Sequence, residues 1–168
     1  MRPEDLRALQ APLKDAYRAA PERAVVTLRA AGRLDETALS CHVDTGRAII
    51  EAGLHPATGG TGLEACSGDL LLQALVACAG VTLRAVATAL DLPVRGGEVR
   101  AEGDLDFRGT LGVSKDAPVG FTAIRLQFAL DTDATAEQLA TLEKLTERYC
   151  VVLQTLRVPP VVSVRLAA

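Results

Sequence analysis

The chain has 168 residues, of which 49% are hydrophobic and 23% are charged. This length suits one domain with a substantial hydrophobic core and argues against two full domains. The 18 Lys and Arg residues against 21 Asp and Glu residues give a net charge of −3, which disfavours a nucleic-acid-binding protein because such proteins carry a basic surplus or stripe.

The apolar segments of the chain argue against secretion and against a membrane span. The opening sequence MRPEDLRALQ lacks the apolar stretch of a signal peptide. Residues 70–83 are the most apolar segment, but their length of about 14 residues is short of the ~20 that cross a bilayer. Four cysteines in such a chain favour thiol chemistry, metal binding or packing over structural disulfides. We therefore expect a soluble cytoplasmic domain.

The first third of the chain predicts a helix, three strands and a loop. Residues 4–20 carry leucines at helical spacing, which indicates an amphipathic helix. Three strands are expected to follow, at residues 23–30, 37–43 and 47–52. Residues 44–46 are expected to form the hairpin turn between the last two strands, and the glycine-rich segment 54–62 is expected to be a loop.

A long helix is predicted for the middle of the chain. Ser67 is a suitable N-cap, and Asp69 places a negative charge in the first turn, where the helix dipole favours it. The helix continues to Leu90, shortly before Pro93. Its Ala and Leu content leaves apolar residues on nearly every side, which predicts a helix that is buried all round.

The last third of the chain predicts strands and a second helix. Strands are expected at residues 98–108, 121–130 and 161–166. The second helix covers residues 136–149 behind Thr135 as N-cap, and it continues or kinks into residues 150–156. Because the strands are grouped mostly as hairpins, the predicted fold class is α+β with an antiparallel sheet rather than a doubly wound parallel sheet.

The cysteines are the first candidates for chemistry. Cys66 and Cys78 lie about 18 Å apart along the predicted central helix, too far for a disulfide, which needs Cα atoms within ~7 Å. Cys78 shares a helical stripe with Thr82, and Cys150 ends the second helix, so the thiols of Cys78 and Cys150 can face each other if the two helices pack together. By spacing alone, such buried cysteines are more often small hydrophobic packing residues.

The sequence predicts no metal site and no cofactor. Cys41 and His42 are neighbours on an expected strand, so their side chains point to opposite faces, and no Cys-x-x-Cys or His-x-x-His pair completes a zinc site. The GGTG segment resembles a phosphate-binding loop but lacks the P-loop spacing and its lysine. Ser67 lacks the Gly-x-Ser-x-Gly context of a nucleophile, so helix capping is its expected role.

Two segments together resemble the OsmC/Ohr family of thiol-dependent hydroperoxide reductases. They are SGDLLLQALVACAGVTL, residues 67–83, and RYCVVLQTL, residues 148–156. The family pattern is an Ala/Leu-rich central helix with one cysteine, followed by a second cysteine that opens a later helical segment. Cys78 and Cys150 occupy these two places. The resemblance implies an OsmC-like domain over residues 21–168, with residues 1–20 as an N-terminal helical extension. It also implies antiparallel sheets wrapped around the central helix of an intertwined homodimer.

The resemblance further implies a two-cysteine mechanism. The Cys78 thiolate attacks the O–O bond of an organic hydroperoxide, releases an alcohol and becomes a sulfenic acid. Cys150 condenses with that sulfenic acid to form a disulfide, which an external dithiol of the lipoyl type or a similar thiol reopens. Because apolar surroundings raise the pKa of a thiol, Cys78 needs a nearby cation or hydrogen-bond donor.

In the family an arginine of the first hairpin supplies that cation, and a glutamate orients the arginine. Arg33 is the nearest match by position, with Arg29 and Arg47 as rivals. The position of the glutamate falls on Gly68. The nearby carboxylates are Asp69, one residue along the chain, and Glu64 in the preceding loop.

Two other functions stay open at this level. One is a non-catalytic dimer that binds an apolar ligand between its central helices, which the missing glutamate at Gly68 favours. The other is a thiol redox sensor that signals through its disulfide. Retention of both Cys78 and Cys150 favours the hydroperoxide reductase. Cys41 and Cys66 have no role in the family pattern, although Cys66 is a rival nucleophile because a helix N-terminus lowers the pKa of a thiol.

Overall fold

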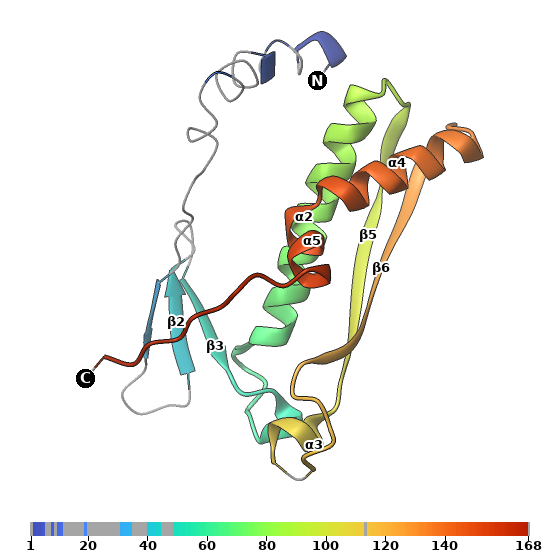
Figure 1. The fold of residues 1–168 in the computed structure, drawn as a ribbon. Helices are drawn as coiled ribbons and strands as arrows, with labels where there is room; N and C mark the ends of the chain where they lie inside the picture. Colours follow the sequence, from blue (N-terminus) through green and yellow to red (C-terminus); the bar gives the residue numbers. More distant parts are fainter. Residues whose placement is uncertain are drawn as a thin grey trace. The chain divides into compact units, whose positions relative to one another are not determined.

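A computed structural model describes residues 2–5, 8, 10–11, 19, 31–34, 40–44, 49–112 and 114–167, with the backbone alone for residues 31–34 and 40–44 (Figure 1). The chain forms two compact units. The first unit comprises Met1–Arg7, Ala74–Arg100 and Gln127–Ala168, and the second comprises Ala8–Gln73 and Ala101–Leu126. The mixture of helices with small, mainly antiparallel sheets confirms the α+β class.

Helix α2 spans Ser67–Ala89, close to the predicted bounds, and carries Asp69 in its first turn. It ends at a turn in which Asp91 has a left-handed φ of 56°. One stripe of this helix is buried, at Leu75, Ala79, Leu83 and Ala87. The expectation of burial on all sides is wrong for the single chain, because Val81 is 72% exposed. The hydrophobic residues of a helix indicate which positions tend to be buried, but the extent of burial depends on the elements that pack against the helix.

Among the described residues, α2 is also the one helix long and apolar enough to cross a membrane, judged by length and composition alone. Its 23 residues exceed the roughly 14-residue apolar segment at its centre. Core helices of water-soluble proteins share this composition, so the property does not by itself assign α2 to a membrane.

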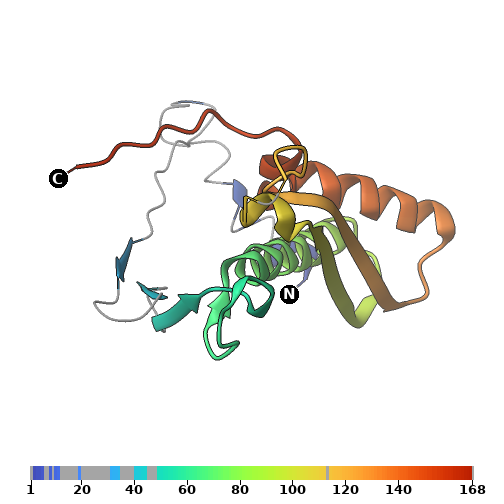
Figure 2. The same ribbon diagram turned by 90° about the horizontal axis from the view of Figure 1, so that it is seen from below.

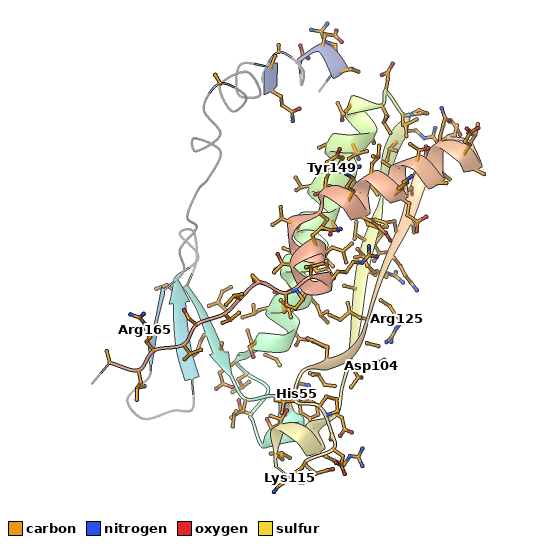
Figure 3. The ribbon with its side chains drawn as sticks, viewed as in Figure 1. His55, Asp104, Lys115, Arg125, Tyr149 and Arg165 are labelled. Carbon is orange, nitrogen blue, oxygen red and sulfur yellow. The ribbon has the colours of Figure 1, made fainter. Side chains whose placement is uncertain are left out.

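Strands β5 (Val94–Leu105) and β6 (Phe121–Thr132) form a two-stranded sheet. Arg95 at the start of β5 and Asp131 at the end of β6 form an ion pair, with their atoms 2.5 Å apart. Arg125 at the start of β6 and Asp104 at the end of β5 form a second ion pair, also at 2.5 Å (Figure 3). The two strands therefore run antiparallel. In the first unit, Val94 belongs to the core cluster that also contains Leu83, Ala87 and Leu142.

The predicted strand 98–108 is wrong at both ends. It begins earlier, at Val94, and it stops at Leu105 because Asp106 caps the short helix α3 (Phe107–Thr110). The Asp106 carboxylate accepts a hydrogen bond from the Arg108 amide at 3.0 Å. A side chain that bonds its local backbone competes with strand pairing, and here it ends the strand.

Helix α4 (Ala136–Tyr149) has the predicted bounds. Thr135 and Gln138 form a capping box, in which the Gln138 amide donates to the Thr135 hydroxyl at 3.3 Å and the Thr135 amide donates to the Gln138 side chain at 2.8 Å. Cys150 follows with extended backbone, φ −73° and ψ 105°, and helix α5 (Val151–Arg157) begins directly after it. The chain therefore kinks at Cys150, one of the two predicted possibilities.

The last predicted strand, residues 161–166, is wrong. The structure describes this segment without regular secondary structure. Its apolar side chains are exposed, at Val161, Val162, Val164 and Leu166. Their spacing is compatible with a strand, but a strand also needs a neighbour for its backbone hydrogen bonds, and no described strand of this chain pairs with it.

The second unit contains a four-stranded sheet in the order β1-β2-β3-β4. Its strands are Ala31–Leu34, Ser40–Asp44, Ile49–Gly53 and Ala65–Cys66. The first two pairings are antiparallel and the third is parallel. β2 and β3 confirm two predicted strands, although Asp44 belongs to β2 and not to the turn. β1 was not predicted as a strand, and the predicted strand 23–30 lies outside the described residues, as do Thr45 and Gly46.

The described residues test part of the remaining predictions near the N-terminus. The predicted loop 54–62 contains a single turn of 3₁₀-helix, Pro56–Thr58, for which the His55 ring accepts a hydrogen bond from the Ala57 amide at 3.0 Å. Of the predicted helix 4–20, the described residues are helical, at positions 4, 5, 8, 10, 11 and 19. The rest of that helix lies outside the described part of the chain.

Candidate functional site

The first unit brings the two candidate cysteines together. Helix α2 carries Cys78 beside its buried stripe, where the side chain is half-buried. The kink between α4 and α5 holds Cys150 in full burial, at 0% exposed. The Cys150 thiol donates a hydrogen bond to the Cys78 sulfur. Two helical segments that lie about 70 residues apart in the sequence therefore meet at one thiol pair. The ribbons of α2 and α5 lie side by side (Figures 1 and 2).

The beginning of α5 supplies further hydrogen bonds to Cys78. The first amides of a helix have no partner within the helix and are free to bind other acceptors. Because the backbone is extended at Cys150, the helix restarts beside α2, and the amides of Val151 and Val152 donate to the Cys78 sulfur. Thr82, one turn further along α2, donates its hydroxyl to the same atom.

These contacts set the pKa of Cys78. Burial raises it, but the hydrogen bonds from the Val152 amide, the Cys150 thiol, the Val151 amide and the Thr82 hydroxyl together outweigh burial, so that the net pKa is lowered. A lowered pKa increases the fraction of thiolate near neutral pH, and the thiolate is the nucleophilic form of cysteine. The arrangement therefore activates Cys78.

Cys150 is affected in the opposite direction. Burial raises the pKa of Cys150, and the neighbouring Cys78 sulfur raises it further, while the nearby Leu153 and Val152 amides offset only part of the effect. The thiol of Cys150 therefore keeps its proton when Cys78 has lost its own. Two titratable groups whose environments push their pKa values apart take different chemical roles.

We expect this difference to appear in the pH dependence of alkylation. Because the pKa of Cys78 is lowered, its rate of alkylation by iodoacetamide should rise with pH and level off below the pH at which an unfolded cysteine levels off. Residue-resolved mass spectrometry of the folded and the urea-unfolded protein measures both profiles. Thr82→Val should move the folded profile to higher pH, whereas Thr88→Val on the same helix should not. Identical profiles in folded and unfolded protein would contradict the assignment.

The other predicted site residues lie in the second unit or outside the described residues. Arg33 stands in β1 opposite His42, and its side chain lies outside the described part of the molecule. Arg29 and Arg47 lie outside it entirely. Among the described residues, the groups that lower the pKa of Cys78 are hydrogen-bond donors and not cations. The sequence analysis expected either a cation or a hydrogen-bond donor near Cys78, and the described residues supply hydrogen-bond donors.

The family's glutamate position has apolar surroundings in the second unit. A Cβ atom at Gly68 would lie 3.4 Å from the Phe121 ring, 3.6 Å from the Cys66 sulfur and 3.6 Å from Leu105. Glu64 accepts a hydrogen bond from the Thr61 hydroxyl in its own loop, which lowers the pKa of the Glu64 carboxyl. Asp69 is exposed, and Cys66 is a half-buried free thiol.

Sequence reasoning missed the donors around Cys78. Thr82 had a signal, because it lies four residues after Cys78 on the same helical stripe. The Val151 and Val152 amides had no signal in the sequence, because every residue except proline carries a backbone amide. Only the kink at Cys150 orients these two amides toward Cys78. Within the described ranges, no group of three or more His, Cys, Asp or Glu side chains is placed to hold a metal ion.

Comparison with known proteins identifies the fold. No curated protein matches the chain. The solved structure of an OsmC-like protein from Mycoplasma pneumoniae matches with a TM-score of 0.66 at 16% identity, over 80% of this chain and 89% of that one. An organic hydroperoxide resistance protein from Elizabethkingia anophelis matches with a TM-score of 0.64 at 16% identity, over 80% and 91% of the two chains.

A third solved structure belongs to an organic hydroperoxide resistance protein OsmC from Legionella pneumophila. It matches with a TM-score of 0.62 at 14% identity, over 80% of this chain and 93% of that one. At these identities the solved structures show a shared fold. The model of the family described as OsmC-like protein matches residues 60–165, which include both Cys78 and Cys150. The chain belongs to the OsmC-like protein family.

Proposed function

We propose that the protein is a thiol peroxidase that reduces organic hydroperoxides through Cys78 and Cys150. The observation that carries this proposal is the contact between a cysteine whose pKa is lowered and a buried cysteine whose pKa is raised. Membership of the OsmC-like family, with solved relatives named organic hydroperoxide resistance proteins, supports the same reaction class.

The proposed reaction has two steps in this chain. The Cys78 thiolate attacks the terminal oxygen of the hydroperoxide, the O–O bond breaks, and the alkoxide leaves and takes a proton from water to become an alcohol. The oxygen stays on Cys78 as a sulfenic acid. The Cys150 sulfur then attacks the Cys78 sulfur, an S–S bond forms, and the oxygen leaves as water with the thiol proton of Cys150. A dithiol of the lipoyl type reduces the disulfide.

The surroundings of the pair favour an organic substrate over hydrogen peroxide. Leu75 and Ala79, on the turn of α2 that carries Cys78, are fully buried, and so is Cys150. An apolar environment of this kind stabilises an alkyl or aryl group by the hydrophobic effect, which hydrogen peroxide cannot exploit. We also propose that Arg33 contributes the positive charge that the family uses at the first cysteine. The reaction needs no cofactor, and its proposed compartment is the cytoplasm.

We further propose that the protein acts as a homodimer. Only 28% of the most apolar 18-residue window of α2 is buried in the single chain. The C-terminal segment also exposes Val161, Val164 and Leu166 and has no paired strand among those described in this chain. A second copy can cover such apolar surface and supply the missing strand neighbour.

Steady-state turnover tests the function. The protein with cumene hydroperoxide and dihydrolipoic acid should consume peroxide catalytically, and it should do so faster than with hydrogen peroxide. Glutathione, a monothiol, should support turnover less well, because the second thiol of a dithiol resolves the mixed-disulfide intermediate intramolecularly. A disulfide that forms but is not turned over by any dithiol would favour a redox sensor. Binding of an apolar ligand without oxidation of either cysteine would favour the non-catalytic dimer.

A further inference from the structure

The hydroxyl of Thr146 is buried without a hydrogen-bond partner. Thr146 is 1% exposed, and its Oγ1 atom finds no donor or acceptor within the described part of the chain. Other threonine hydroxyls in these helices have a hydrogen-bond partner. Thr88 donates to the Arg84 carbonyl at 2.8 Å, and Thr141 donates to the Glu137 carbonyl at 3.0 Å. A buried polar group without a partner costs free energy, so its retention calls for a physical reason.

The position of Thr146 is set by its neighbours one turn away on α4. Four residues earlier, Leu142 belongs to the core cluster with Leu83 of α2. Four residues later, Cys150 contacts Cys78 of α2. Because residues four apart share a helix face, Thr146 lies in the interface between α4 and α2, between that cluster and the thiol pair.

The hydroxyl of Thr82 stands in the corresponding position on α2. Thr82 is one turn beyond Cys78, next to Leu83, and it already donates to the Cys78 sulfur. Each cysteine of the pair therefore has a threonine hydroxyl one helical turn away, that of Thr82 on α2 and that of Thr146 on α4. In the reduced protein, one of them has an acceptor and the other has none.

We propose that Thr146 donates a hydrogen bond to the oxygen that Cys78 carries as a sulfenic acid. This inference rests on the proposed peroxidase function. In the condensation step, the Cys150 sulfur attacks the Cys78 sulfur, the S–O bond breaks, and the oxygen gains negative charge until it takes the thiol proton of Cys150 and leaves as water. A hydroxyl already in place stabilises that developing charge without reorganising at the moment of reaction. The acceptor exists only after oxidation, which accounts for the unpartnered hydroxyl in the reduced protein.

Quenched-flow oxidation with one equivalent of cumene hydroperoxide tests this role. Sulfenic acid trapped by dimedone and disulfide are each quantified by mass spectrometry over time. Thr146→Val keeps the shape of the side chain and removes the donor, so we expect disulfide formation to slow on the order of tenfold, the effect of one lost hydrogen bond. Sulfenic acid formation should be unchanged. Thr146→Ser, which keeps the hydroxyl, should restore most of the rate.

Two controls separate this role from a structural one. Thr141→Val on the same helix should leave both rates unchanged, and thermal unfolding of each variant reports its fold. Equal disulfide rates in Thr146→Val and the original protein would overturn the inference and leave the peroxidase function standing. Failure of the original protein to form sulfenic acid would instead refute the proposed function. If Thr146→Val does not fold, Thr146→Ala and Thr146→Ser make the same comparison.

Discussion

Replacement of Cys78 by serine is expected to abolish hydroperoxide reduction, with a loss of roughly a thousandfold or more, as for removal of other catalytic nucleophiles. The physical reason is specific to this site. The Val151 and Val152 amides, the Cys150 thiol and the Thr82 hydroxyl lower the pKa of a thiol at this position. A serine hydroxyl ionises far above neutral pH, and these contacts do not bring it into that range. The initial rate of cumene hydroperoxide consumption measures the loss.

Cys66→Ser is the matched control for this variant. Cys66 is a free, half-buried thiol at the end of β4, directly before α2, and the sequence analysis named it as the rival nucleophile. Its replacement removes one sulfur without touching the Cys78–Cys150 contact, so activity should be retained. Loss of activity in Cys66→Ser together with retention of activity in Cys78→Ser would contradict our account, because it would identify Cys66 as the nucleophile.

Leu142→Ala should destabilise the protein by about 2–5 kcal/mol, the range for removal of a buried leucine side chain. Leu142 is 1% exposed and belongs to the core cluster with Leu83, Ala87 and Val94. It therefore joins α4 to α2 and β5. Because α4 leads directly to Cys150, a looser α4 should also slow disulfide formation. The free energy of unfolding from urea denaturation and the rate of disulfide formation measure the two effects.

Leu111→Ala provides the control for leucine truncation. Leu111 follows the short helix α3 and is 55% exposed. Its replacement should change the free energy of unfolding by less than about 0.5 kcal/mol, as is usual for surface positions. Similar losses at Leu111 and Leu142 would contradict the proposed core of the first unit.

The predictions from sequence succeeded where the signal is local. Helix α4 has its predicted bounds because Thr135 caps it within one turn and its apolar residues recur at helical spacing. The strand 98–108 failed at its end because Asp106 forms a competing local cap. The strand 161–166 and the complete burial of α2 failed for a different reason. Both depend on what lies against the segment, and hydrophobic pattern alone does not contain that information.

The candidate site divides in the same way. Cys78 and Cys150 were identified by the family resemblance, and the spacing of Thr82 from Cys78 was visible in the sequence. The Val151 and Val152 amides could not be identified, because their direction depends on the extended backbone at Cys150. The unpartnered hydroxyl of Thr146 was equally hidden, since its burial results from the packing of α4 on α2.

A non-reducing peptide map after one equivalent of cumene hydroperoxide tests the central claim most directly. The original protein should contain a Cys78–Cys150 disulfide within seconds. Cys150→Ser should instead carry a trapped sulfenic acid on Cys78, and Cys78→Ser should carry neither product. If all four cysteines of the original protein remain free thiols after prolonged exposure, the two-cysteine peroxidase is contradicted.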